Sequence, residues 1–253
     1  MPVVDAIFDL LFPSRLACRL CGSLLTPAER GPADYSVAKA HEAGAGELPS
    51  IPGLCRACRE SVASIHYDCA VCGRAAAGAG LCFSCQQKVH VYRQVRYAGL
   101  FDGALKEAVH RFKYAGEYRL APTLGAMMAF VAIKEGMVGD VVVPVPLYPA
   151  RERERGYNQK ALLAGEISRH TGRPVYWGLS RTRATSPQAN LPPERRAANV
   201  AGAFVYRGDS LAGLRVVLVD DVLTTGSTAD ACAQALVAAG ARWVDVLVVA
   251  AAP

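Results

Sequence analysis

The sequence predicts an α/β protein, with a parallel sheet covered by helices on both faces and a small cysteine-rich domain in front of it. Valine-rich runs alternate with helical patterns in the second part of the chain, which is typical of a parallel sheet buried on both faces. Before them, eight cysteines stand in four C-x-x-C pairs. The composition changes after the last pair, so we expect two domains, at residues 1–90 and 91–253.

Composition and charge limit the classes of protein that fit. Hydrophobic residues make up 52% of the 253 residues and charged residues 20%, which supports a packed core. An uninterrupted apolar run of about 18 residues is absent from the sequence, so we expect no membrane span. The segment MPVVDAIFDLLFP has acids but no basic leader, so we expect an amphipathic helix rather than a signal peptide, and a cytoplasmic protein.

The net charge of +6 fits a phosphate-bearing partner without requiring one. The charge is unevenly placed, because residues 169–207 hold seven arginines and a single acid, Glu194. Two interpretations remain open. The segment is either a solvated loop or a loop that faces phosphate groups or nucleic acid.

The paired cysteines indicate two structural zinc sites. A cytoplasmic protein keeps its thiols reduced, and two C-x-x-C pairs supply the four thiolates of a tetrahedral zinc ion. Four thiolates leave no open coordination position, so we do not expect catalytic zinc. A ninth cysteine, Cys232, lies in a helical pattern and is predicted to be buried. The predicted ligands are Cys18, Cys21, Cys55, Cys58, Cys69, Cys72, Cys82 and Cys85.

Two pairing schemes are compatible with this spacing. Sequential pairing places the first four cysteines on one ion and the last four on the other, whereas a cross-braced arrangement interleaves them. The stretch between Cys21 and Cys55 is rich in Ala, Gly and Pro and reads as an inserted loop. Its length does not exclude a shared site, because the entropy of loop closure grows only with the logarithm of length.

The elements of the second domain follow in order. An alternating strand is expected first, then two helices, a strand ending in prolines, an amphipathic helix, a strand, a helix and a last valine-rich strand. Ligands of such sheets bind at the carboxyl ends of the strands. The predicted ranges are 91–101, 102–114, 118–134, 141–147, 160–170, 216–219, 229–239 and 243–251.

The stretch VVLVDDVLTTGST, residues 216–228, carries the strongest functional signal. Backbone N–H groups at the start of the following helix can hold a phosphate. Gly226 permits close approach of the backbone, and four hydroxyls can donate to phosphate oxygens. The loop lacks the G-K-[ST] of a Walker A motif, so we expect a monophosphate. The hydroxyls belong to Thr224, Thr225, Ser227 and Thr228.

The two aspartates of this stretch need a separate explanation, because adjacent carboxylates repel each other. Asp220 and Asp221 can accept hydrogen bonds from the two hydroxyls of a ribose, or bind a magnesium ion that bridges them. The alternative is a pair of solvated acids at a strand end before a helix cap.

This stretch resembles the ribose-phosphate signature of the type I phosphoribosyltransferases, which bind phosphoribosyl pyrophosphate (PRPP). Two further blocks, VPVPLYPARERERGYNQ and RTRATSPQANLPPERRAANVAGAF, together with the cysteine-rich start, resemble the ComF family of competence-associated proteins. The resemblance covers nearly the whole chain. It implies the type I phosphoribosyltransferase fold with an N-terminal double zinc ribbon.

The resemblance also implies roles for particular residues. The loop Pro144–Leu147, with Val145, is expected to bind pyrophosphate, flanked by Arg151 and Arg155. Arg153, Asn158 and Gln159 of the same block are expected to flank the pyrophosphate as well. A solvated helix start with i,i+4 ion pairs is the alternative there. The segment 181–199 is expected to close over the substrate. PRPP with magnesium is the implied ligand, and displacement of pyrophosphate through an oxocarbenium-like transition state is the implied chemistry.

Two functions remain open. The ComF resemblance implies that the protein handles internalised single-stranded DNA during natural transformation, with a partner such as a helicase. Few aromatics accompany the arginine-rich segment, whereas single-strand binders usually offer stacking rings. The intact acids and phosphate loop favour a true phosphoribosyltransferase of nucleotide metabolism or salvage. Amidophosphoribosyl transfer is not expected, because the N-terminus supplies no cysteine nucleophile. We identify no segment that would recognise an acceptor base.

Overall fold

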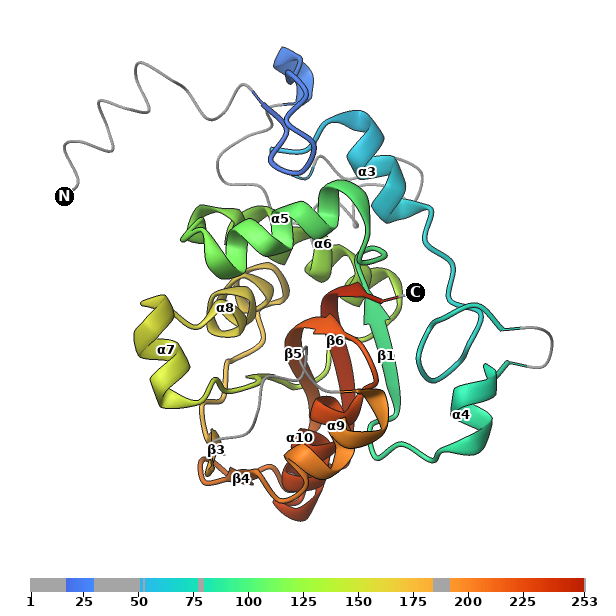
Figure 1. Ribbon diagram of the computed structural model, residues 1–253, viewed down its shortest axis with the longest axis vertical. Coiled ribbons are helices and arrows are strands. Elements are labelled where there is room, and N and C mark those ends of the chain that lie inside the picture. Colours follow the sequence, from blue (N-terminus) through green and yellow to red (C-terminus); the bar gives the residue numbers. More distant parts are fainter. Residues whose placement is uncertain (1–16, 30–50, 52, 77–79, 184–191, 253) are drawn as a thin grey trace.

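The computed structural model describes residues 17–29, 51, 53–76, 80–183 and 192–252 (Figure 1). The expected N-terminal amphipathic helix and most of the expected insert after Cys21 lie outside these residues. No helix among the described residues is long and apolar enough to cross a membrane.

Four parallel strands form the central sheet, in the order β1-β6-β5-β2. The sheet is made of β1 (Gln94–Tyr97), β2 (Val141–Pro144), β5 (Arg215–Leu223) and β6 (Trp243–Ala251). The edge strands are shorter than predicted. β5 is longer and includes both aspartates, because β6 continues to pair alongside it as far as Ala251.

Helices cover both faces of the sheet, as the valine-rich strands predict. Along β5, Val217 and Val219 face one core while Val216 and Leu218 face the other, because successive side chains of a strand point to opposite faces. The first core is closed by α5 (Gly103–Tyr114), α6 (Ala121–Lys134) and α8 (Gln159–Thr171). The second is closed by α9 (Pro193–Val200) and α10 (Ser227–Ala238) (Figure 1).

Smaller elements complete the described part of the chain. The predicted helix 118–134 starts as a 3-10 turn, η3 (Tyr118–Leu120), and continues as α6 with Pro122 in its first turn, where a missing N–H removes no helical hydrogen bond. β3 (Leu179–Arg181) and β4 (Phe204–Tyr206) pair antiparallel outside the central sheet. The other short helices are η2 (Pro27–Glu29), α3 (Arg56–Ala63), α4 (Phe83–Gln87) and α7 (Pro149–Arg155).

The cysteine-rich region packs directly on the sheet domain. Leu54 and Val62 belong to the same buried cluster as α5 and α6, and Val71 packs against the other core. The backbone N–H of Val95 in β1 donates to the carbonyl of Val71 at 2.6 Å. The predicted fold class is therefore confirmed: a parallel phosphoribosyltransferase-type sheet joined to an N-terminal region of zinc-ribbon type.

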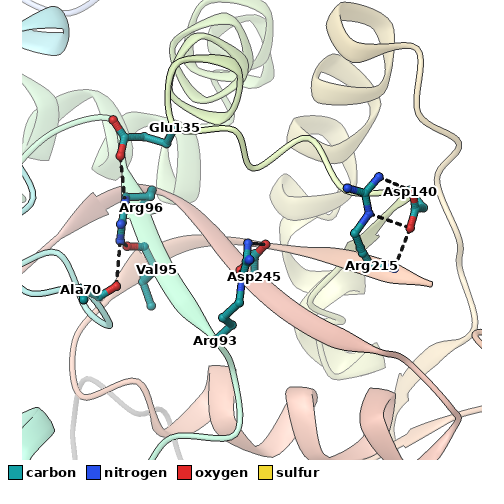
Figure 2. A network of polar contacts seen from close by, with 8 residues as sticks. All are labelled: Ala70, Arg93, Val95, Arg96, Glu135, Asp140, Arg215 and Asp245. Atoms are coloured by element: carbon teal, nitrogen blue, oxygen red, sulfur yellow. Dashed lines mark hydrogen bonds and ion pairs between the residues drawn. The ribbon is translucent and has the colours of Figure 1, made fainter. Parts of the chain in front are cut away.

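Ion pairs secure the amino end of the sheet, opposite the end where ligands are expected. Figure 2 shows Arg215 at the start of β5 holding Asp140, which precedes β2, through bonds of 2.7 and 3.0 Å. In the same view Arg93 holds the buried Asp245 of β6 at 2.6 and 2.8 Å. Each arginine binds its aspartate through two parallel hydrogen bonds, a strong arrangement that ties neighbouring strands together at this end. The charged residues of the carboxyl end are not used for this purpose.

Candidate functional site

A cavity of about 600 Å³ opens at the carboxyl end of β5, with walls from the loop after β2 and from α5, α7 and the start of α10. This size is ordinary for a small-molecule site. The structure brings all ten residues predicted to bind PRPP to its lining. They are Val145, Arg151, Arg155, Asp220, Asp221, Thr224, Thr225, Gly226, Ser227 and Thr228.

The phosphate-loop candidate, Thr224–Thr228, leads into α10 as predicted. Gly226 caps that helix with a φ of 76°, a conformation that favours glycine. The structure gives a different reason for this glycine than the approach of a phosphate. A Cβ at Gly226 would lie 2.6 Å from the hydroxyl oxygen of Tyr92, so the space beside it is already filled by the protein. Thr225 and Ser227 share a hydrogen bond of 2.9 Å.

The two aspartates are buried and paired, which rules out the alternative of solvated acids at a strand end. Asp220 accepts from Lys160 at 3.0 Å, and Asp221 accepts from Lys113 at 2.7 Å. Both acids are less than 9% exposed. Asp220 also accepts from the backbone N–H of Asp221 at 2.8 Å. Each carboxylate therefore has its own counter-ion, and the repulsion between the two is offset.

Their surroundings shift the pKa values of the two carboxyl groups in opposite directions. Burial and the neighbouring Asp221 raise the pKa of Asp220 above its ordinary value. Burial also opposes the charge of Asp221, but Lys113 and Lys160 outweigh it and hold the pKa of Asp221 below its ordinary value. Such divergence between adjacent groups is common in functional sites.

The arginine block forms a short helix, α7, and still contributes to the cavity. Arg151 and Arg155 are one turn apart, so they share a helix face, and both line the cavity. Arg153 is exposed. Asn158 caps α8 by accepting from the N–H groups of Lys160 and Ala161. Gln159 is fully buried, and neither it nor Asn158 belongs to the cavity lining.

Only the two ends of the expected closing segment, 181–199, are described. Arg181 lines the cavity and lies over the Phe204 ring at 5.5 Å. Helix α9 forms the other end, while residues 184–191 lie outside the described part.

Sequence reasoning missed several cavity residues. Lys113 and Lys160 lie in segments predicted to be amphipathic helices, where a lysine is usually on the solvent-exposed face, so neither was predicted to line a site. The cavity lining also includes the rings of Phe101, His110 and Tyr114. Tyr114 directly follows Lys113 at the end of α5, and a lysine–tyrosine pair at a helix end gives little signal by itself.

Each predicted set of four cysteines comes together in sequential pairing, and within each set the ligand atoms all lie within 4.8 Å. The cross-braced alternative is excluded. The Sγ atoms of Cys21 and Cys55 lie 3.6 Å apart, and those of Cys72 and Cys82 lie 3.5 Å apart. A tetrahedral zinc ion places its sulfurs about 3.8 Å apart, since each lies about 2.3 Å from the metal. A disulfide would need about 2.05 Å.

Thiol chemistry at both groups suits a metal. Burial opposes the ionisation of Cys21 and Cys69, yet hydrogen bonds to each sulfur outweigh it and lower the pKa of both thiols to about 6. Burial raises the pKa of Cys55, Cys58, Cys72 and Cys85, so these thiols need the charge of a metal ion to ionise. Thiolates are the form that binds zinc. Cys232 is fully buried in α10, as predicted.

The second cysteine group, Cys69 to Cys85, is tied to the phosphate-loop candidate. Arg74 follows this group's Cys72 by two residues and donates to the carbonyl of Thr224. Beyond Cys85, Lys88 and His90 bind Asp230 in the first turn of α10 at 2.6 and 2.8 Å. The cysteine-rich region therefore supports the loop from outside the cavity.

Comparison with known proteins gives relatives along most of the chain. No protein-family model matches it. "DNA utilization protein YhgH" of Salmonella typhimurium is 32% identical over 221 residues, which cover 78% of this chain and 96% of that protein. "Competence protein F" of Haemophilus influenzae is 30% identical over 204 residues, covering 77% and 88%. "Competence protein ComFC" of Bacillus subtilis is 29% identical over 198 residues, covering 74% and 79%.

Among solved structures, the chain is similar to the glutamine PRPP amidotransferase of B. subtilis, with 25% identity and a TM-score of 0.37. The match covers 55% of this chain and 30% of that one, so it spans about a third of the amidotransferase.

Proposed function

The chain belongs to the ComF family of competence proteins, and on this premise we propose that it binds PRPP in the cavity at the end of β5 and takes part in handling DNA during natural transformation. One observation carries the proposal. Ten residues selected from the sequence as a PRPP site lie around a single cavity, although they come from segments up to about eighty positions apart.

Each part of PRPP has a matching group in the proposed site. The backbone N–H groups at the start of α10 would hold the 5′-phosphate, aided by the helix dipole. Asp220 and Asp221 would accept hydrogen bonds from the ribose hydroxyls. Arg151 and Arg155, with the backbone around Val145, would hold the pyrophosphate. The cavity lining has five Lys and Arg side chains against three carboxylates, a balance that favours a polyanion.

Magnesium fits this scheme as a partner of PRPP. The carboxylates of Asp220 and Asp221 are the hard oxygen ligands that magnesium prefers. In the free protein Lys160 and Lys113 already neutralise them, at 3.0 and 2.7 Å. Asp220 and Asp221 would hold the ion, which would neutralise charge on PRPP, and Lys113 and Lys160 would then be available to the phosphate oxygens.

The DNA role rests on the relatives. One carries the name of a DNA utilization protein, and two others are named as competence proteins. We extend this role to the present chain in the cytoplasm, with single-stranded DNA and a DNA-uptake partner such as a helicase. The exposed arginines at 173, 183, 195 and 207 would meet the strand.

A true phosphoribosyltransferase is the second candidate, and the paired lysines favour it. A leaving pyrophosphate develops negative charge, and Lys113 and Lys160 lie beside the carboxylates that would hold the ribose. Such preplaced cations lower the barrier where charge develops. The C1–oxygen bond to pyrophosphate would break as a bond from C1 to an acceptor nitrogen forms, and the acceptor would lose a proton.

Calorimetric titration of the full chain with PRPP and magnesium, with and without a short single-stranded DNA, tests the proposal. We expect saturable PRPP binding that Arg151→Met and Arg155→Met weaken. No heat with PRPP, in a protein that is folded and metal-loaded, would overturn it. Pyrophosphate release in the presence of candidate bases would then decide between the enzyme and the binding protein.

A further inference from the structure

An aromatic row lines one wall of the cavity, at the helix α5. Phe101 lies just before α5, His110 is in its third turn and Tyr114 is its last residue. The ring centroids of Phe101 and His110 are 5.7 Å apart, and those of His110 and Tyr114 are 6.0 Å apart. His110 and Tyr114 share one helix face, because they are four residues apart. The ring planes of Phe101 and His110 are inclined by 47° and those of His110 and Tyr114 by 87°, so neighbouring rings are tilted or edge-on to each other and Tyr114 presents its own face.

Packing of the protein explains only Phe101, which is partly buried against the core that α5 and α6 close. Tyr114 is 67% exposed and His110 is exposed as well. The Arg155 guanidinium lies over the Tyr114 ring at 5.0 Å from its centroid. Even with this contact most of the tyrosine side chain meets solvent inside the cavity opening. An exposed aromatic surface next to a cationic side chain is suited to a flat ring that stacks.

The row is placed where a base would lie. Lys113 reaches Asp221, the proposed ribose ligand, and the next residue is Tyr114. The phosphate-loop candidate belongs to α10, on the opposite face of the sheet from α5 (Figure 1). A ligand that spans the cavity from α10 to α5 would therefore pass the two aspartates midway. Phosphate, ribose and base follow each other in this order in a nucleoside 5′-phosphate.

We propose that Tyr114, His110 and Phe101 form a nucleobase subsite, which takes the ring of a nucleoside 5′-phosphate whose phosphate lies at Thr224–Thr228. This inference rests on the proposed function of the cavity and adds the class of the second ligand. The cavity of about 600 Å³ has room for more than a ribose phosphate. The base can come from a free nucleotide or from the 5′-phosphorylated end of a single DNA strand.

The experiment uses calorimetry on the full, metal-loaded chain with ribose 5-phosphate, AMP and an eight-residue oligothymidylate with or without a 5′-phosphate. Tyr114→Leu should weaken AMP binding by roughly five- to 150-fold, the range for one lost base–aromatic stack. Its affinity for ribose 5-phosphate should stay within about twofold of the wild-type affinity. Tyr114→Phe should retain AMP affinity. The control is Trp177→Leu, which removes another ring that is 63% exposed and lies outside the cavity lining.

A second readout follows the ring itself. The fluorescence of 2-aminopurine riboside 5′-phosphate falls when the base stacks, so wild type and Tyr114→Phe should quench it and Tyr114→Leu should not. The same variant distinguishes the two sources of the base. If Tyr114→Leu loses affinity for AMP alone, the ligand of the subsite is a free nucleotide. A loss that also affects the phosphorylated oligonucleotide, but not the unphosphorylated one, assigns the strand end.

Two failures are distinguishable. If neither PRPP nor ribose 5-phosphate binds the wild type, the proposed function is wrong and the subsite with it. If ribose 5-phosphate binds but AMP binds no tighter, and Tyr114→Leu changes neither, only the nucleobase subsite is overturned.

Discussion

Replacing Lys160 by methionine tests whether the buried lysines hold the two aspartates in place. Lys160 is 9% exposed, and its Nζ lies 3.0 Å from Asp220. At this distance the attraction between unit charges is about 1.4 kcal/mol in water and about 5.5 kcal/mol at an effective dielectric constant of 20. The cavity admits solvent, so we take an intermediate value. Lys160→Met should lower the free energy of unfolding by about 2–4 kcal/mol, since removing one partner leaves a buried charge.

Thermal unfolding at pH 7 measures the effect. For a chain of this size, about 1 kcal/mol shifts the midpoint by roughly 2–4 °C, so Lys160→Met should melt roughly 4–16 °C lower. Adding Asp220→Asn should recover much of the loss, because it removes the unpaired charge. The matched control is Lys106→Met on the exposed side of α5, which should change little. If Lys160→Met melts with wild type, or if the double variant melts no higher than the single one, the pair does not stabilise the fold.

The same pairs change an expectation from the sequence. Mutual repulsion alone predicts that Asp220→Asn with Asp221→Asn melts no lower than wild type. The structure shows a lysine at 3.0 and 2.7 Å from these carboxylates. The double asparagine variant would leave both lysines without a counter-ion, so we now expect it to melt lower. Its PRPP affinity should still fall by about ten- to a hundredfold for each lost charge-assisted hydrogen bond.

Three further predictions concern other parts of the chain. Metal analysis should find about two zinc ions per chain, and chelation should unfold the cysteine-rich region; disulfides without metal, in protein prepared reduced with zinc present, would contradict this. Gly226→Ala should be destabilised by about 1–2 kcal/mol or more for its left-handed conformation, and Tyr92→Phe should restore part of the loss by removing the hydroxyl that meets the new Cβ; equal melting of the single and double variants would argue against that contact. Burial, with Arg169, lowers the pKa of His170 to about 4, below its unfolded value of about 6.5, so this residue's stabilisation is complete above pH 6.5 and is lost as the pH falls toward 4. Wild type should therefore lose more of its melting temperature between pH 7 and 5 than His170→Gln, and equal losses would refute the assignment.

The sequence by itself determined the class of fold and most of the proposed site. Apolar residues at every position from 216 to 219 require two apolar faces, and a parallel sheet between helix layers supplies them. The C-x-x-C spacing brings two sulfurs of each pair to one point whatever the rest of the chain does. The acids and the phosphate-loop candidate could be predicted because they lie in one short continuous motif, whose local geometry depends on neighbours in the chain. The two arginines were predicted from the resemblance of their block to the ComF family.

Only the tertiary structure decided what those motifs meet. Lys113 and Lys160 come from two different helices, and their meeting with Asp221 and Asp220 depends on how α5 and α8 pack on the sheet. The contact between Tyr92 and Gly226 joins positions 134 residues apart.

The aromatic row of α5 has the same origin. From the sequence alone, a tyrosine at a helix end is indistinguishable from an ordinary surface residue. Only the packing of α5 beside the cavity shows that Tyr114 lines it. Contacts across such separations are set by the packing of whole elements, and no pattern within a short window of sequence carries that information. The chemistry of the short motifs could therefore be predicted from the sequence. The counter-ions of the aspartates, the filled space beside Gly226 and the exposed rings of the cavity became known only from the tertiary structure.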